Sequence, residues 1–409
     1  MSGGSIGGLR RRSSRLRSRR GLILATLLAS YSLVYFHRTM TGVMEAEIAA
    51  ISRQYGYSPE FFLSVLASAY FYAYSLSQFA VGSLIDYYGI KRVGSFLLLL
   101  LALGTALIVP QDPIVMVFGR AVIGFTSVAA FLSYQRSLSL YFKPEEQARA
   151  TALALAAGSF TAMVATYPLR QALDAVGLSG TVVALTAVTL AIAVSVYLAS
   201  TDTRASGDVR EYFAKTRANL RDVLLDKHGW GVSIGALATY GTGLSFQSSW
   251  GQILLSRAFC MGRVEVSLYL LLLAATFMAT CPAAGYLSDR VLRKRKPLLL
   301  ASSISMAFSW SLLLVSSITA NLALLLISLL SLGISLGPHI VISVMMREAH
   351  GPARAATSVA FMNTVLFLGV AVLNSTLPQL GYCEATGISI ALAAAGSAAV
   401  YFLTRETYS

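Results

Sequence analysis

The sequence predicts an all-α membrane protein in which twelve transmembrane helices form two pseudo-symmetric bundles of six. Three observations lead to this prediction. Hydrophobic residues make up 56% of the chain and charged residues only 12%, apolar stretches recur at membrane-spanning length, and one long charged segment divides the chain near its middle. A soluble fold with so few charges would expose large apolar patches, so the lipid bilayer is the simpler solvent.

The chain begins with a basic segment, residues 1–20, that carries seven arginines. A secretory signal peptide also begins with basic residues, but the apolar run that follows here is too long and has no convincing cleavage site. We therefore interpret residues 1–20 as a cytoplasmic tail that contacts anionic lipid.

Twelve later stretches are apolar and long enough to cross the hydrocarbon core, which takes about 20 residues of helix. Several are rich in glycine, which lets membrane helices approach closely. The predicted spans are 21–44, 61–82, 93–110, 113–141, 150–171, 177–199, 229–256, 264–285, 297–317, 320–346, 355–377 and 384–403.

The distribution of Lys and Arg predicts the orientation of these spans. With the N-terminus inside, 25 of the 32 basic residues fall in cytoplasmic segments, and the outer loops hold four: Arg53, Arg170, Arg257 and Arg263. Because cytoplasmic loops are enriched in Lys and Arg, we expect a multi-pass protein of the cell membrane with both termini in the cytoplasm.

The longest charged gap separates six spans from six others. The predicted organisation is therefore a basic tail, an N-terminal bundle, a cytoplasmic linker, a C-terminal bundle and a short C-terminal tail, at residues 1–20, 21–199, 200–228, 229–403 and 404–409 respectively.

Two local repeats indicate that the halves arose by duplication. GSLID, from Gly82, recurs as GYLSD from Gly285, and ARATALAL, from Ala148, recurs as ARAATSVAF from Ala353. The two shifts, of 203 and 205 residues, agree, and both repeats fall in loops at equivalent places in each half. The duplication is therefore parallel in topology.

The loop from Gly82 to Arg92 resembles the signature G-x-x-x-D-x-x-G-x-[RK]-[RK] of the major facilitator superfamily. The segment Gly119-Arg120-x-x-x-Gly124 resembles the arginine-bearing motif of the same family. The resemblance extends over residues 21–403 and implies the fold of that superfamily and the function of a solute permease.

The resemblance also implies a conformational latch in these loops. In the family, the loop aspartate, here Asp86, joins the two halves when the transporter faces outward, which predicts a contact near Arg354–Thr357. A carboxylate is favoured at a helix N-terminus, and glycines allow the tight turn. The second copy has Leu292 where a second glycine is expected. The predicted latch residues are Gly82, Asp86, Gly89, Lys91, Arg92, Gly285, Asp289, Arg290 and Arg293.

Arginines at membrane depth are candidate functional residues because a buried charge is unfavourable in lipid. Arg38 lies in the first span and Arg120 in the fourth, and no Asp or Glu lies deep in any span. We therefore expect Arg38 and Arg120 to attract the negative part of a substrate. The alternatives are an ion pair of Arg38 with Glu45, and a role for Arg120 in bonding backbone carbonyls between helices.

Histidine, tyrosine and amide side chains complete the predicted cavity. His37 and His339 could carry a coupling proton, although a neutral hydrogen-bonding role is the alternative, and the aromatic and amide residues could equally be packing surface. The predicted substrate-binding residues are Tyr35, His37, Arg38, Tyr70, Tyr74, Gln78, Arg120, Gln135, Tyr240, Gln247, Trp250, His339 and Asn363.

These observations predict a monomeric secondary transporter that works by alternating access on a small organic anion or zwitterion, such as a carboxylate, an amino acid or a phosphorylated metabolite. Efflux of hydrophobic compounds is the alternative within the family, and a membrane enzyme or a channel is the alternative outside it. The three cysteines are isolated and no Walker-type loop occurs, which predicts no metal, no cofactor and no ATP hydrolysis. The basic residues form no continuous face, so no nucleic-acid partner is expected.

Overall fold

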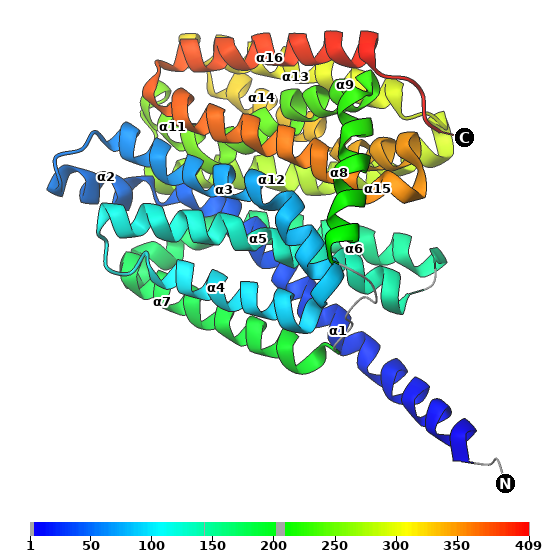
Figure 1. Cartoon of the computed structure of the whole chain (residues 1–409). Coiled ribbons are helices and arrows are strands. Elements are labelled where there is room, and N and C mark those ends of the chain that lie inside the picture. Colours follow the sequence, from blue (N-terminus) through cyan, green and yellow to red (C-terminus); the bar gives the residue numbers. More distant parts are fainter. Residues whose placement is uncertain (1–3, 143, 202–208, 409) are drawn as a thin grey trace.

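The computed structural model describes residues 4–142, 144–201 and 209–408, and every regular element within these residues is a helix. Figure 1 shows the helices of the first bundle, blue to green, below those of the second bundle, green to red. The predicted all-α fold class is confirmed.

The first bundle starts and ends on one side of the molecule, where both chain ends also lie (Figure 1). We call this the terminal side, and the opposite side, which carries the short helix α2 (Glu45–Gln54), the far side. The spans of this bundle are α1 (Gly4–Val43), α3 (Pro59–Tyr88), η1 with α4 (Ile90–Gly94 and Ser95–Ala106), α5 (Pro113–Tyr141), α6 (Pro144–Val164) and α7 (Tyr167–Ala199).

The helix α8 (Val209–Leu225) connects the bundles on the terminal side. The seventh span alternates between α and π turns: α9 (Lys227–Ala236), η2 (Leu237–Gly241), α10 (Thr242–Ser245), η3 (Phe246–Trp250) and α11 (Gly251–Ala258). The remaining elements are α12 (Arg263–Tyr286), η4 (Leu287–Leu292), α13 (Lys296–Thr319), α14 (Leu322–Leu336), α15 (His339–Thr376), η5 (Leu377–Gln379) and α16 (Tyr382–Leu403).

Two glycines break long helices at the borders between spans. Gly177 in α7 and Gly351 in α15 have φ of 70° and 69°, a conformation that residues with a Cβ rarely adopt. Gly351 thus separates the tenth span from the eleventh. The fifth span ends at Val164, earlier than the predicted residue 171, and the stretch from Tyr167 to Gly177 is a separate far-side segment.

Capping residues start three helices on the far side. Ser58, Asp112 and Asn321 each accept a backbone N–H from the first turn of α3, α5 or α14. These N–H groups have no partner within their own helix. The caps therefore define where the second, fourth and tenth spans begin.

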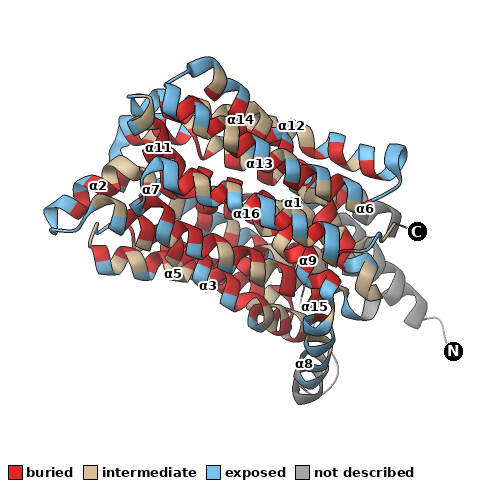
Figure 2. Cartoon of the chain, turned by 90° about the horizontal axis from the view of Figure 1, so that it is seen from above, coloured by how far each residue is buried: buried red, intermediate tan, exposed pale blue. Residues whose placement is uncertain are grey.

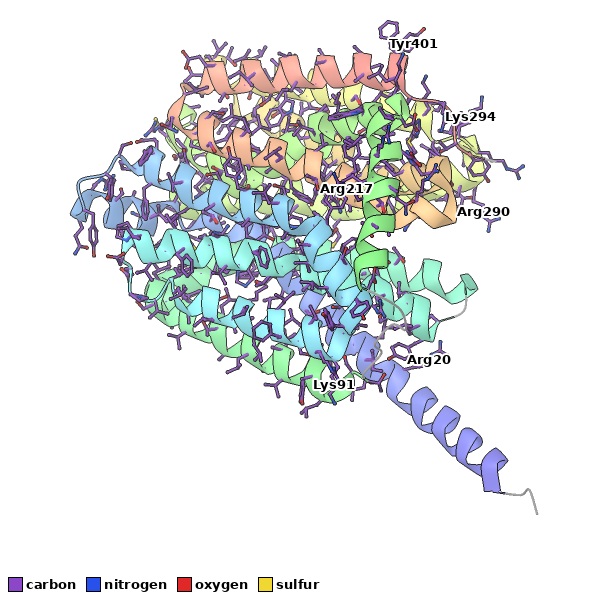
Figure 3. The ribbon with its side chains drawn as sticks, viewed as in Figure 1. Arg20, Lys91, Arg217, Arg290, Lys294 and Tyr401 are labelled. Carbon is purple, nitrogen blue, oxygen red and sulfur yellow. The ribbon has the colours of Figure 1, made fainter. Side chains whose placement is uncertain are left out.

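Exposed residues lie on the outer faces of the bundles, whereas buried residues face inward (Figure 2). Many of the exposed residues are large and apolar, among them Leu76, Ile114 and Phe402. Seven helical stretches among the described residues are apolar and long enough to cross a bilayer by length and composition alone. The basic side chains labelled in Figure 3, Arg20, Lys91, Arg217, Arg290 and Lys294, lie toward the terminal side. Apolar flanks and a basic rim are typical of a multi-pass membrane protein.

A stripe of serines joins α13 to α14 within the second bundle. Ser302 donates to the carbonyl oxygen of Ser335 over 2.6 Å, and the Ser309 and Ser331 hydroxyls lie 2.6 Å apart. Small polar side chains let two membrane helices approach closely and satisfy each other's hydrogen bonds in lipid.

The most extensive contacts between the two bundles are those of α3 with α15, α1 with η3, and α6 with α12. Because η3 faces α1, the irregular seventh span lies against the arginine-bearing first span. The candidate site lies at this contact.

Candidate functional site

A small cavity lies between the bundles, next to Arg38. Its volume of about 10 Å³ is close to the space that one water molecule requires. The bundles are therefore packed closely around the central residues in this conformation. The residues that line the cavity are Tyr35, Arg38, Thr39, Ala162, Tyr240, Leu244, Gln247, Phe277 and Leu336.

Arg38 is held by aromatic rings rather than by a carboxylate. Its side chain is 5% exposed, and Nη2 donates to the hydroxyl of Tyr74 over 2.6 Å. The guanidinium carbon lies 5.0, 4.8 and 4.7 Å from the ring centres of Tyr35, Tyr74 and Phe367. Ring faces attract a cation at this range but do not neutralise it.

No Asp or Glu is among the described residues that line the cavity. Glu45, the alternative partner of Arg38, begins α2 beyond the end of α1 and is surrounded by Arg263 and Arg257. Burial raises the pKa of Glu45 even though these two arginines act to lower it. Within the described residues, the positive charge of Arg38 therefore faces the cavity without a balancing carboxylate.

Tyrosines from the first bundle form the wall behind Arg38. Tyr31 and Tyr35 share a hydrogen bond of 2.9 Å between their hydroxyls, and Tyr31 stacks on Tyr134 with ring centres 5.9 Å apart. Tyr70 stacks on Tyr74 at 5.8 Å. The predicted residues Tyr35, Tyr70 and Tyr74 thus lie together and are buried.

The second bundle contributes residues from the two π-helical segments. Tyr240 in η2 and Gln247 in η3 both line the cavity, and π turns are frequent at functional sites. The ring of His339 stacks on Tyr240 with 3.8 Å between ring centres. The side chain of Tyr240 therefore lies between His339 and the cavity.

Arg120 lies within the first bundle and connects three helices. It donates to the carbonyl oxygens of Leu66 in α3 and His37 in α1, over 3.2 and 3.0 Å, and it packs on the ring of Tyr70. This geometry matches the backbone-bonding alternative. The ring nitrogens of His37 are buried and have no partner among the described residues.

Some predicted residues lie away from the cavity. Trp250 donates to Ser245 and packs on Trp310, and Gln78 bonds the backbone of its own helix at 3.5 Å. Gln135 and Asn363 are not among the residues that line the cavity. The structure therefore brings together Tyr35, Arg38, Tyr70, Tyr74, Tyr240, Gln247 and His339.

Phe367 is the contact of Arg38 that the sequence analysis missed. It lies on α15 one helical turn after Asn363, which was predicted. The periodicity of that helix could have indicated it, but an aromatic residue in an apolar span carries no distinguishing sequence signal.

The first motif loop forms an ion pair inside the first bundle. Asp86 accepts from Arg136 over 2.8 Å, and Gly89 ends α3 with φ of 91°, which requires glycine. A Cβ at Gly82 would meet only an ordinary contact, with Leu132. Arg354, near which the latch contact is expected, pairs here with Asp222 of α8 over 2.7 Å.

The central residue of the second motif loop is Arg295, which is not among the predicted latch residues. Asp289 pairs with Arg295, which also contacts Glu348 at 3.2 Å. With the repeat shift of 203 residues, Lys294 and Arg295 align with Lys91 and Arg92. The latch role of Arg290 and Arg293 stays a prediction. Arg293 has φ of 50°, in the left-handed region, and ends η4.

Contacts between the bundles occur on the far side and at mid-depth. Arg257 of α11 pairs with Glu60 of α3, and a Cβ on Gly42 would lie 3.0 Å from the carbonyl oxygen of Gln247. Thr364 donates to the carbonyl oxygen of Ser75 over 3.4 Å. The far side is therefore closed.

Comparison with known proteins identifies a family, a curated relative and many structural neighbours, of which one is described below. The model of the family described as the Major Facilitator Superfamily matches residues 27–373. The Uncharacterized transporter YybO of Bacillus subtilis (strain 168) is 35% identical over 109 residues, an alignment that covers 25% of this chain and 24% of that protein. The matched region thus spans about a quarter of the curated relative.

The crystal structure of a D-xylose-proton symporter superposes with a TM-score of 0.73. The superposition covers 94% of this chain and 98% of that one, at 12% sequence identity. At this identity the likeness concerns the fold alone.

Proposed function

The chain belongs to the major facilitator superfamily and is a membrane transporter, and from this premise we propose that it moves a small organic anion or zwitterion by alternating access. Carboxylates, amino acids and phosphorylated metabolites are the candidate substrates. The observation that supports this substrate class is Arg38, whose buried charge faces the cavity with no carboxylate among the described lining residues. An anionic substrate would supply the missing charge.

In the proposed cycle, the bundles 21–199 and 229–403 of a monomer rock about Arg38, joined by the linker 200–228. The terminal side, with residues 1–20 and 404–409, is the cytoplasmic side of the cell membrane in this proposal, which the positive-inside distribution supports. The structure, closed on the far side, then represents an inward-facing or occluded stage.

Proton coupling is a subsidiary proposal. The structural neighbour is, by its name, a proton symporter, and His339 lies beside Tyr240 at the cavity of this chain. Dissipating the proton gradient in proteoliposomes should then lower the accumulation of substrate.

Efflux of hydrophobic compounds is the second candidate function. The cavity wall includes Leu244, Phe277 and Leu336, which would suit an apolar cargo. Such a cargo would leave the charge of Arg38 unbalanced, and for this reason we place efflux second.

A thermal-shift screen of the purified protein tests the substrate class. We expect organic anions to raise the melting temperature, because a ligand that binds the folded state stabilises it by mass action. Each carboxylate is compared with its neutral amide, which has nearly the same shape and should give no shift. Hits confined to cationic or apolar drugs would overturn the proposed substrate class and make efflux the leading function.

Replacing Asp86 by asparagine tests the proposed latch. The change removes the negative charge of Asp86, which pairs with Arg136 here and which the latch requires. We expect the transport rate to fall by a factor of about five, equivalent to a loss of about 1 kcal/mol in the free energy of the latch contact. The amount of inserted protein should not change, because a partly exposed ion pair contributes little to stability. Asp112→Asn, which neutralises a far-side carboxylate but leaves a side-chain oxygen that can cap α5, is the matched control. Equal transport rates in wild type and Asp86→Asn would count against the latch.

A further inference from the structure

The C-terminal segment Thr404–Tyr408 folds back over the terminal side of the second bundle. It follows the end of α16 at Leu403, and Figure 1 shows it, in red, running from α16 to the terminal ends of neighbouring helices. Lys296 holds its start by donating to the carbonyl oxygens of Tyr401 and Thr404 over 2.8 and 2.7 Å.

Glu406 binds the N-terminus of α13. Its carboxylate accepts the backbone N–H groups of Arg295 and Lys296 over 2.8 and 3.2 Å, and those of Thr407 and Tyr408 over 3.0 and 3.1 Å. Burial acts to raise the pKa of Glu406, but these four hydrogen bonds outweigh it and hold the pKa below its usual value. Glu406 is therefore a charged cap on a helix of another part of the chain.

The next two residues hold the second motif loop. The hydroxyl of Tyr408 donates to the carbonyl oxygen of Asp289 over 3.1 Å, and its ring lies 4.9 Å from the guanidinium carbon of Arg295. Thr407 donates to Glu348 of α15 over 2.8 Å. Since Arg295 itself bonds Asp289 and Glu348, the segment completes a network across η4, α13 and α15.

Arg405 attaches the segment to the start of α9. Its backbone N–H donates to Nδ1 of His228 over 3.0 Å, and its guanidinium lies 3.5 Å from the carboxylate of Asp226. Burial and the charge of Arg405 lower the pKa of His228 to about 4, so the ring is neutral at pH 7 and can accept this bond. The five residues thus bind to four elements of the same bundle.

We propose that Thr404–Tyr408 is an intramolecular clamp that holds the second motif loop against its own bundle and so favours the conformation closed on the far side. Asp289 is the counterpart of Asp86 by the repeat. To close the terminal side, η4 must approach the first bundle, and the clamp opposes this movement by holding Asp289 and Arg295 in place. The clamp rests on the proposed alternating access, but it requires no particular substrate.

The variant Glu406→Ala in the full chain tests the clamp. Spin labels are placed on the far side, one on each bundle, at Tyr57→Cys and at the native Cys260, both of which are exposed. The other cysteines, Cys281 and Cys383, are replaced by serine. Pulsed electron spin resonance then reports the distance between the far-side ends without any substrate.

In Glu406→Ala we expect the ratio of long to short distances between the two labels to rise about tenfold. This is the change in equilibrium that follows from losing hydrogen bonds to a charged group. Glu384→Ala is the matched control, because Glu384 also caps a helix, α16, by accepting the N–H of Gly381 over 2.7 Å, but on the far side and away from the clamp. It should leave the ratio unchanged.

A distance distribution in Glu406→Ala equal to that of the wild type, or shifted toward shorter distances, would overturn the clamp. The milder Glu406→Gln should shift the ratio in the same direction by less. Because no ligand enters this measurement, its failure would leave the anion proposal standing, and a thermal-shift screen without anionic hits would leave the clamp standing.

Discussion

Replacing Arg38 by glutamine is expected to abolish binding and transport of anions while leaving the substrate-free protein at least as stable as the wild type. Binding falls because the cavity loses its charged donor. We expect at least a hundredfold loss of affinity, about 2.7 kcal/mol, which is within the range for a hydrogen bond to a charged group.

The stability of the substrate-free protein should rise because the charge of Arg38 is buried with aromatic partners and one tyrosine hydroxyl. An arginine at the centre of a transmembrane helix is unfavourable by roughly 2.5–3.5 kcal/mol on insertion scales. A neutral glutamine removes this unfavourable free energy of burying a charge. Melting curves with and without the best anion from the screen measure both effects in one experiment.

Arg120→Gln is the matched comparison, since it also neutralises a buried arginine. Arg120 bonds the carbonyl oxygens of Leu66 and His37 and so connects α5 to α3 and α1. We expect this variant to melt at a lower temperature and to retain anion-induced shifts. If Arg38→Gln melted lower and still responded to anions, Arg38 would be a structural residue and the substrate proposal would fail.

Adding a single methyl group at Gly124 is expected to lower the melting temperature and the yield of folded protein. A Cβ at this position would lie 2.1 Å from the carbonyl oxygen of Tyr70, and the atom in the way is backbone, which cannot rotate aside. The helices α5 and α3 would have to separate. Overpacking of this kind reduces stability by about 1–3 kcal/mol or more.

The same separation would move Tyr70 and the helix that carries Tyr74, so transport per folded molecule should fall as well. The measurement is the monodisperse fraction after extraction, together with the melting temperature. Gly387→Ala is the control, because a Cβ there meets no atom within 4 Å. A Gly124→Ala protein as abundant and as stable as Gly387→Ala would show that the two helices do not pack as described.

The sequence was sufficient to predict the fold because each span can be recognised from its own residues, without knowledge of its neighbours. Apolar length located the helices, and the repeat of GSLID as GYLSD predicted the parallel duplication. The limits of the spans were less predictable from apolar length. Pro168 and Gly177 are residue types that allow a break, but the apolar run continues past Val164, so its length alone extended the predicted fifth span beyond the end of α6.

The candidate site was only partly predictable because its contacts join distant helices. Arg38 could be selected from its charge, and Tyr35 from helical spacing, but the ring of Phe367 reaches Arg38 only through the packing of α15 against α3. The pairing of Asp86 with Arg136 depends likewise on how α3 packs on α5. One sequence contains the residues of such contacts but not their pairing.

The unbalanced charge of Arg38 also has an electrical consequence for a carrier that works by alternating access. An empty carrier would move about one positive charge through part of the membrane field, whereas a carrier loaded with a monoanion would move none. A full crossing is worth about 2.3 kcal/mol for each 100 mV. The membrane potential, negative inside, would then draw the empty cavity toward the cytoplasm, so that voltage acts on the return step rather than on the loaded one.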